Sequence, residues 1–334
     1  MKCVKVPLKE LNDTRIKLME KGLMNMEYRI KASDDYGYIP INDDIDDYEI
    51  ADIDLEPMKK VPHNFSELLE DELTSEEIEN LRTSFDTIGD IVILEIPDDL
   101  QDKKLLIGDA ALKFTKRKSI YMKKSAIKGT TRVRDLEFLA GEDDSVTIHK
   151  EHGARLKLDV REVYFSPRLA TERKRVMESV KEGEKILDMF CGIGPFPIVI
   201  ARNKNVEIAA VDINESAIRY LDENIRMNKL KGSIKTYCGD VREVSKSFNL
   251  KFDRIIMNLP GLAYTFLDVA VDLIEDGGTI NYYEFSDSYE QGIKRLENAC
   301  HEAGKEVEII NTRKVKSTSP GEWHVAIDGK INIP

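Results

Sequence analysis

The sequence lacks any apolar run near the roughly 20 residues that a helix needs to cross a bilayer. Its first residues, Met-Lys-Cys-Val-Lys-Val-Pro, also lack the apolar core of a signal peptide. These two absences predict a cytoplasmic protein with no membrane partner. With 334 residues, 41% of them hydrophobic and 34% charged, the chain is typical of a globular protein of two or three domains.

Cysteine is scarce, and no two cysteines form a Cys-x-x-Cys pair. Their wide separation favours reduced, mostly buried thiols over a disulfide framework or a zinc site. His149 and His152 have the spacing of a possible ligand pair, but no cysteine or further histidine lies near them in the sequence. The sequence therefore predicts no metal site.

Acidic residues are absent between Ala110 and Arg134, although the net charge of the whole chain is −12. This basic island contains Lys113, Lys116, Arg117, Lys118, Lys123, Lys124, Lys128, Arg132 and Arg134. A second basic cluster follows at Arg168, Arg173, Lys174 and Arg175. A solvated face explains any single lysine equally well, but such an island can bind several phosphates of a polyanion. For the island as a whole we favour the polyanion.

A glycine turn follows a short apolar run in residues 186–196, Ile-Leu-Asp-Met-Phe-Cys-Gly-Ile-Gly-Pro-Phe. This order predicts a strand that ends at Asp188, a tight turn through Gly192 and Gly194, and a helix, the layout that binds nucleotide-like ligands. A Cβ in the turn would block close approach of a ligand to the backbone. The third glycine of the dinucleotide fingerprint is missing, which argues against NAD.

Polar residues end the next three predicted strands as well. Asp212 closes the run 206–212, Asp240 follows Tyr237-Cys-Gly, and Asn258 precedes Leu-Pro after the run 252–257. One acid can accept both ribose hydroxyls and another can reach an adenine amino group. The pattern predicts a domain that binds S-adenosylmethionine (AdoMet). The alternative is that these acids only cap the helices that follow.

The chain shows no internal repeats, and its patterning predicts three α/β domains at 1–60, 61–160 and 161–334. In the first, we expect a helix over 8–24 and strands over 38–41 and 50–55. In the second, we expect helices over 65–85 and 98–114 and strands over 90–96, 119–122, 146–149 and 155–159. In the third, a doubly wound sheet adds strands over 278–285, 307–311 and 323–327.

Three segments together resemble the archaeal and eukaryotic tRNA (guanine-37, N1)-methyltransferases. They are residues 132–142, residues 163–173, and residues 188–196 followed by Asn258-Leu-Pro260, and the segment 147–153 also matches. The resemblance covers the chain from about residue 90 onward and is weaker over the first 60 residues. It implies an N-terminal domain that contacts the tRNA elbow, a middle domain, and a class I (Rossmann-like) AdoMet methyltransferase domain. It also implies a monomer.

The resemblance implies transfer of the AdoMet methyl group to N1 of the guanine at position 37 of a tRNA. Glu172 would be the general base for the N1 proton, Arg132 would stabilise charge on O6, and Asn258 would hold the guanine edge. Substrate contacts would come from Arg134, Tyr164 and Arg168, and the base would be extruded from its stack. The residues implied in AdoMet binding are Arg173, Asp188, Phe190, Gly192, Gly194, Asp212, Ile213, Asp240, Val241, Asn258 and Pro260.

Each role has a structural alternative. Glu172 could be a solvent-facing residue paired with Arg175, the two arginines near 132 could be phosphate clamps, and Tyr164 could belong to the core. After Pro260 the family has a Lys-Phe-Ala-His-like stretch, whereas this chain has Gly261-Leu-Ala-Tyr264. That difference removes a lysine and a histidine near the expected site.

Four other functions are weighed against guanine N1-methylation. They are aminocarboxypropyl transfer in wyosine biosynthesis, a bifunctional methyltransferase that also acts on an imidazoguanine, an inactive tRNA-binding protein with an AdoMet fold, and a protein or small-molecule methyltransferase. The presence of Glu172 and of Asn258-Leu-Pro260 disfavours aminocarboxypropyl transfer. Asn258 also disfavours the bifunctional methyltransferase, and the intact acids disfavour an inactive protein. The basic island disfavours the fourth.

Overall fold

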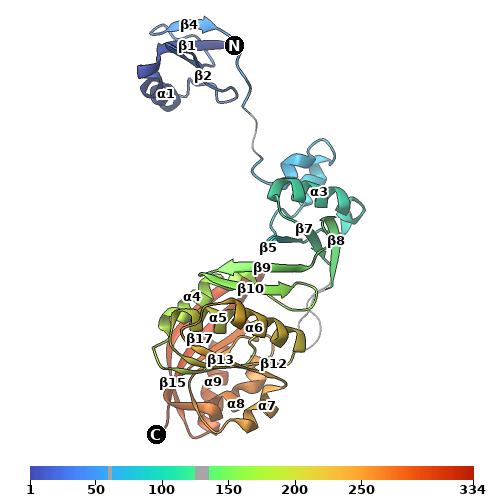
Figure 1. The fold of residues 1–334 in the computed structure, drawn as a ribbon, viewed down its shortest axis with the longest axis vertical. Coiled ribbons are helices and arrows are strands. Elements are labelled where there is room, and N and C mark those ends of the chain that lie inside the picture. Colours follow the sequence, from blue (N-terminus) through green and yellow to red (C-terminus); the bar gives the residue numbers. More distant parts are fainter. Residues whose placement is uncertain (59–61, 125–134) are drawn as a thin grey trace. The chain divides into compact units, whose positions relative to one another are not determined.

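A computed structural model describes residues 1–58, 62–124 and 135–334 of the chain (Figure 1). Its contacts divide the chain into two units, Met1–His63 and Asn64–Pro334, and each has its own hydrophobic core. Across these described ranges, no helix combines the length and the apolar character that a membrane span requires.

The first unit is a four-stranded antiparallel sheet with one helix against it. Its strand order is β2 (Lys31–Ala32), β3 (Tyr36–Pro40), β1 (Lys2–Pro7) and β4 (Glu49–Asp52). Helix α1 (Leu11–Glu20) follows a short 3-10 turn, η1 (Leu8–Glu10), and ends before Gly22, which has a φ of 66°. The helix predicted over 8–24 is therefore too long at its C-terminus, because only glycine adopts this left-handed conformation at low cost.

The second unit begins with a smaller α/β part. Its sheet has the order β5-β6-β7-β8, in which only the β6–β7 pair is parallel. The strands are β5 (Asp86–Ile88), β6 (Ile91–Leu94), β7 (Ser119–Lys123) and β8 (Leu136–Gly141). The helices are η2 (Phe65–Leu69), α2 (Ser75–Asn80), η3 (Asp98–Lys103) and α3 (Lys104–Thr115). The helix predicted over 65–85 is two short helices, because Thr74 begins a new one with a capping box to Glu77.

The larger part of the second unit is built on a seven-stranded sheet of order β13-β12-β11-β14-β15-β17-β16. Its strands from β13 to β15 are parallel, and β17 runs antiparallel to both neighbours. They are β11 (Lys185–Asp188), β12 (Glu207–Asp212), β13 (Ser233–Cys238), β14 (Phe252–Met257), β15 (Ile274–Ser286), β16 (Glu306–Ser319) and β17 (Glu322–Asn332). The predicted α/β fold class with a doubly wound sheet is confirmed.

Helices cover both faces of this sheet (Figure 1). One side carries α4 (Ala170–Ser179), α5 (Pro195–Asn203) and α6 (Glu215–Met227). The other side carries α7 (Val241–Val244), α8 (Leu267–Leu273) and α9 (Glu290–Glu302). Buried apolar residues fill both interfaces, so the sheet is covered on both sides as parallel strands require.

A β-hairpin formed by β9 (Val146–Glu151) and β10 (Ala154–Asp159) packs on helix α6. The Asn224 side chain accepts from the Lys157 amide at 2.7 Å and donates to the Lys157 carbonyl at 3.1 Å. Asn228 binds Arg155 in the same way, at 3.0 and 2.7 Å. Asn224 of α6 and Asn228, which follows its last residue, therefore satisfy backbone groups at the edge of β10.

Candidate active site

A cavity of about 330 Å³ lies at the carboxyl ends of the central strands. β11 and β12 end in Asp188 and Asp212, and Asp240 and Asn258 follow the ends of β13 and β14. Because neighbouring parallel strands end at one edge of the sheet, these four residues gather there. The predicted site residues that line the cavity are Tyr164, Arg173, Phe190, Gly192, Asp212, Ile213, Asp240, Val241, Asn258 and Pro260.

Other predicted site residues lie outside the lining of this cavity. Asp188, Glu172 and Gly194 are not part of its wall, and Arg168 lines a neighbouring cavity of about 310 Å³. Arg132 and Arg134 lie outside the described residues. Five residues border both cavities, namely Tyr164, Phe165, Ser166, Phe285 and Lys316, so the two spaces adjoin.

The two glycines of the turn serve different purposes. Both have positive φ, 53° at Gly192 and 81° at Gly194. A Cβ at Gly194 would overlap the Leu221 side chain, so this glycine allows the turn to pack against helix α6. At Gly192 a Cβ would meet no described protein atom nearer than 4.0 Å, so the space beside it is open to a ligand.

The Asp212 carboxylate closes the turn from the second strand. Its Oδ2 accepts from the Gly192 amide at 2.7 Å, and its Oδ1 accepts from the Asn214 amide at 2.9 Å. Burial raises the pKa of Asp212, although these backbone hydrogen bonds act in the opposite direction. Each oxygen retains acceptor capacity, which suits two vicinal hydroxyls of a ribose.

Asp188 is fully buried and only half satisfied. Its Oδ1 accepts from the Phe190 amide at 3.2 Å, whereas Oδ2 has no hydrogen-bond partner among the described residues. Burial raises the pKa of Asp188 to about 8, and the nearby Asp212 charge adds to the effect. A buried carboxylate oxygen of this kind fits a cationic or hydrogen-bonding ligand group.

We expect this carboxyl group to make the stability of the ligand-free protein depend on pH. The folded pKa of about 8 exceeds the value of about 3.9 of an unfolded Asp. Because the folded state binds this proton more tightly, the stabilisation is complete below pH ~4 and is lost as the pH rises through 8. The loss amounts to about 1.4 kcal/mol per pH unit within that window.

Urea unfolding of the wild type and of Asp188→Asn at pH 5, 6.5 and 8 measures this effect. The Asn variant keeps an acceptor for the Phe190 amide and cannot ionise, so its unfolding free energy should fall less between pH 5 and 8. Parallel pH profiles of the two proteins would contradict the raised pKa of Asp188.

The aromatic side chains of Phe190 and Phe266 form part of the cavity wall. Phe190 contacts Phe266 edge to face, with 5.0 Å between the ring centroids, and the Arg242 guanidinium lies 3.8 Å from the Phe266 ring centroid. Asp240 caps helix α7 by accepting from the Arg242 amide at 2.8 Å. Sequence reasoning missed Arg242 and Phe266, although the spacing of Arg242 two residues after Asp240 was a usable signal.

Glu172 is buried, with 1% of its surface exposed, and its carboxylate is held by neighbours. Arg175 donates to Oε1 at 2.6 Å and the Tyr283 hydroxyl donates to the same oxygen at 2.8 Å. Arg313 lies 3.4 Å from Oε2. A solvent-facing Glu172 is therefore excluded, whereas its pairing with Arg175 is observed.

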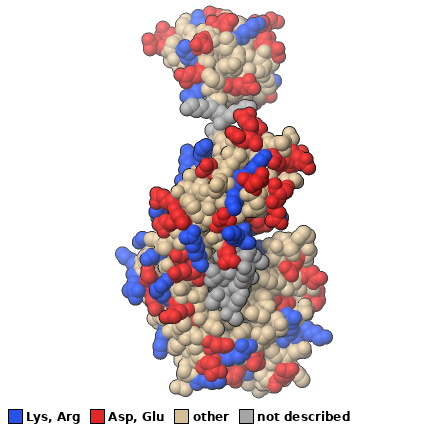
Figure 2. All heavy atoms as spheres, turned by 90° about the vertical axis from the view of Figure 1, so that its right-hand side faces the viewer, with Lys and Arg blue, Asp and Glu red and all other residues tan. Residues whose placement is uncertain are grey.

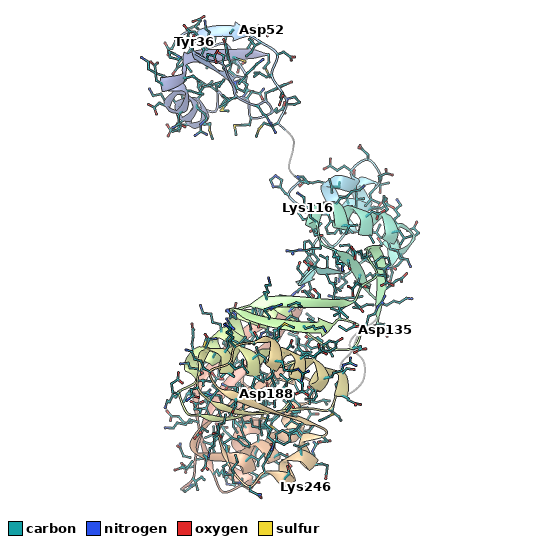
Figure 3. The ribbon with its side chains drawn as sticks, in the orientation of Figure 1. Tyr36, Asp52, Lys116, Asp135, Asp188 and Lys246 are labelled. Atoms are coloured by element: carbon teal, nitrogen blue, oxygen red, sulfur yellow. The ribbon has the colours of Figure 1, made fainter. Side chains whose placement is uncertain are left out.

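Most described members of the basic island are paired with acids from other segments. Lys118 contacts Glu142 and Asp144, and Lys123 contacts Asp86 and Glu95. Lys124 contacts Glu137, and Arg168 of the second cluster donates to Asp86 at 2.6 Å. Figure 2 shows blue basic and red acidic atoms interspersed on the surface of the second unit. Lys116, labelled in Figure 3, ends helix α3 with a φ of 53° and is exposed.

Three family models match the chain. The TRM5/TYW2 methyltransferase domain matches residues 147–310, the TYW2 N-terminal domain 65–144, and the tRNA methyltransferase 5 N-terminal domain 3–49. The tRNA (guanine(37)-N(1))-methyltransferase Trm5b of Pyrococcus abyssi is 41% identical, with 99% of each chain covered. The chain belongs to the Trm5 family. The predicted resemblance and the AdoMet methyltransferase fold are confirmed.

Solved structures of a Trm5 and of a TYW2 are similar to this chain. The structure of aTrm5 in complex with tRNALeu has a TM-score of 0.85 and 39% identity, and the match covers 99% of each chain. The structure of Methanocaldococcus jannaschii TYW2 in complex with AdoMet has a TM-score of 0.58 and 30% identity, covering 75% of this chain and all of that one.

The stretch Gly261–Tyr264, which departs from the pattern expected for the Trm5 family, lies at the edge of the cavity. Leu262 and Thr265 line the cavity, whereas the Tyr264 ring lies 4.3 Å from the Arg295 guanidinium. Arg295 in turn donates to Glu284 at 2.9 Å. Tyr264 therefore takes part in a contact with helix α9 and is not part of the cavity wall.

Proposed function

We propose that this chain transfers the methyl group of AdoMet to N1 of guanine 37 in tRNA. Membership of the Trm5 family supports this function. The structural observation that carries it is the composition of one cavity, which is lined by Asp212 and Asp240 and also by Asn258 and Pro260. A methyl transfer between two nucleoside-containing reactants requires that one cavity hold groups for both of them.

The residues of the cavity fit AdoMet. We propose that Asp212 accepts from the ribose hydroxyls and that Asp240 accepts from the adenine amino group. Phe190, Ile213 and Val241 would pack against the adenine ring, and the open space at Gly192 would admit the ligand close to the backbone. Asp188, with its unsatisfied Oδ2, would support the amino-acid end. AdoMet supplies an electrophilic methyl group on a sulfonium.

The chemistry requires removal of one proton. N1 of guanine attacks the methyl carbon, the carbon–sulfur bond breaks, and the N1 proton leaves to a base, which gives 1-methylguanine and S-adenosylhomocysteine. We propose Glu172 as this base. Because Arg175 and Tyr283 bind the carboxylate in this structure, its side chain has to turn from them toward the guanine.

We propose that Asn258, Tyr164 and the adjoining second cavity receive the target nucleotide. Tyr164 borders both cavities, which suits a ring that stacks on an extruded base. Arg132, Arg134 and Arg168 would bind O6 and phosphates. Arg168 must exchange its contact with Asp86 for a phosphate if it is to do so.

We also propose three functional parts, residues 1–60, 61–160 and 161–334, with tRNA contacts in each. The hairpin β9–β10 precedes residue 160 but packs on helix α6, so it joins the second part to the third. Monomeric action and a cytoplasmic location remain predictions from the sequence.

Methyl transfer from labelled AdoMet to unmodified tRNA transcripts with G or A at position 37 tests the function. We expect 1-methylguanosine, identified by mass spectrometry, only on the G37 transcript. Binding of AdoMet without transfer to either transcript would contradict guanine N1-methylation. With AdoMet labelled in its amino-acid part, a labelled aminocarboxypropyl adduct on a wyosine-precursor tRNA would instead support the alternative reaction.

A further inference from the structure

Arg173 is a nearly completely buried arginine, 1% exposed, that lines the larger cavity. Its Nε donates to Glu151 Oε1 at 2.5 Å and its Nη2 donates to Glu151 Oε2 at 2.6 Å. Nη2 also donates to the Ser166 carbonyl at 3.1 Å. Within the described ranges, the third nitrogen, Nη1, has no acceptor.

Glu151 ends strand β9 and is not part of the cavity wall. Its carboxylate lies 3.7 Å from His149 Nε2, and the His149 ring packs against Phe165 with 5.0 Å between centroids. The Arg173 guanidinium lies 5.1 Å from the same Phe165 ring. Burial alone would raise the pKa of Glu151, but the nearby His149 and the hydrogen bonds from Arg173 hold it below its ordinary value. The carboxylate is therefore ionised.

A two-point contact fixes the plane of a guanidinium. The Nε and Nη2 groups of Arg173 both bind the Glu151 carboxylate, so the guanidinium cannot rotate. The direction of Nη1 is therefore fixed. A lone buried arginine would lack this constraint and would carry an uncompensated charge. The fixed donor therefore suits an acceptor oxygen of the ligand that carries negative charge, such as a carboxylate oxygen.

We propose that Glu151 is a positioning residue for AdoMet: it holds Arg173 so that Nη1 donates to the carboxylate of the amino-acid end. The inference rests on the proposed AdoMet site. Glu151 acts through Arg173 and contacts no reactant. His149 extends the arrangement, because its Nδ1 accepts from the Gly89 amide at 3.3 Å in the turn between β5 and β6.

Two ligands separate a positioning role from a general loss of structure. S-Adenosylhomocysteine carries the amino-acid carboxylate, and 5′-methylthioadenosine has the same nucleoside and sulfur but lacks that group. For Glu151→Gln we expect the Kd of S-adenosylhomocysteine to rise about tenfold or more, because a charge-assisted contact is weakened. The Kd of 5′-methylthioadenosine should change less than about twofold, a difference near the error of calorimetry.

Glu184→Gln is the matched control. Glu184 forms a comparably buried pair with Arg254, at 2.8 Å, and neither residue lines the cavity. This variant should lose thermal stability while the ratio of the two Kd values stays that of the wild type. If Glu151→Gln does not fold, Glu151→Asp replaces it, because Asp keeps the charge. Glu151→Asp should raise the Kd of S-adenosylhomocysteine and leave that of 5′-methylthioadenosine unchanged.

Equal changes for both ligands, or no change for either, would overturn the positioning role of Glu151. Failure of the wild type to bind S-adenosylhomocysteine would instead remove the proposed AdoMet site itself. The two failures are distinguishable because the first is a comparison of the variants with the wild type, whereas the second is measured on the wild type alone.

Discussion

Glu172→Gln is expected to lower the turnover of methyl transfer by about 10²–10⁴-fold while AdoMet binding is retained. The amide cannot accept the N1 proton, yet it keeps the size of the carboxylate and an acceptor for the Tyr283 hydroxyl. Burial raises the pKa of Tyr283, so this hydroxyl keeps its proton and remains a donor. Single-turnover kinetics with G37 transcript, together with calorimetry of AdoMet binding, measure both quantities.

Glu178→Gln on the same helix is the control for this variant. Glu178 is exposed and pairs with Lys174 at 3.7 Å, so its replacement should leave turnover near the wild-type value. Unchanged turnover in Glu172→Gln would remove Glu172 as the base. It would leave Glu172 as an anchor that ties α4 to β15 through Tyr283.

Asp212→Ala is expected to weaken AdoMet binding about 10- to 100-fold, whereas the affinity for tRNA stays unchanged. The estimate corresponds to a net loss of about one hydrogen bond to a charged acceptor, which is worth roughly 1.5–3 kcal/mol. The substitution also leaves the Gly192 and Asn214 amides without the Asp212 acceptor, which loosens the turn proposed to contact the ligand. Calorimetry with AdoMet and filter binding with tRNA test the two halves of the expectation.

Asp222→Ala is the matched control, since Asp222 accepts from Thr236 at 2.9 Å and does not line the cavity. Its AdoMet affinity should equal that of the wild type. Equal AdoMet affinity in Asp212→Ala would refute the ribose role, and a parallel loss of tRNA affinity would indicate damage beyond the cavity.

The gathering of polar strand ends at one edge of the sheet was predictable because its signal is local. A strand that ends in a polar residue is visible in ten residues of sequence, and parallel neighbours bring such ends together. Asp188, Asp212 and Asp240 illustrate this. Glu151 and Glu172 were harder to interpret, because their partners Arg173 and Tyr283 lie 22 and 111 residues away.

The local count of charged residues was the least reliable guide from the sequence to the structure. The basic island contains no acid in sequence, yet Lys118, Lys123 and Lys124 meet acids supplied by other strands and loops. A local count of charges ignores such partners, so it overstates the positive potential of this segment. The family match supports tRNA as a partner independently of that count.

The asparagines at the edge of β10 imply a geometric limit on how this enzyme can vary. Asn224 and Asn228 are four residues apart on a helix, a rise of about 6 Å, and the strand residues they bind are two apart, roughly 6.6 Å. The rise of four helix residues and the rise of two strand residues are similar, so both asparagines can reach the strand at the same time. Asn224 also donates to the Ile193 carbonyl at 3.1 Å, between the two glycines. A one-residue insertion between Asn224 and Asn228 would therefore move Asn228 away from Arg155, whereas Asn224 would still join the hairpin to the glycine turn.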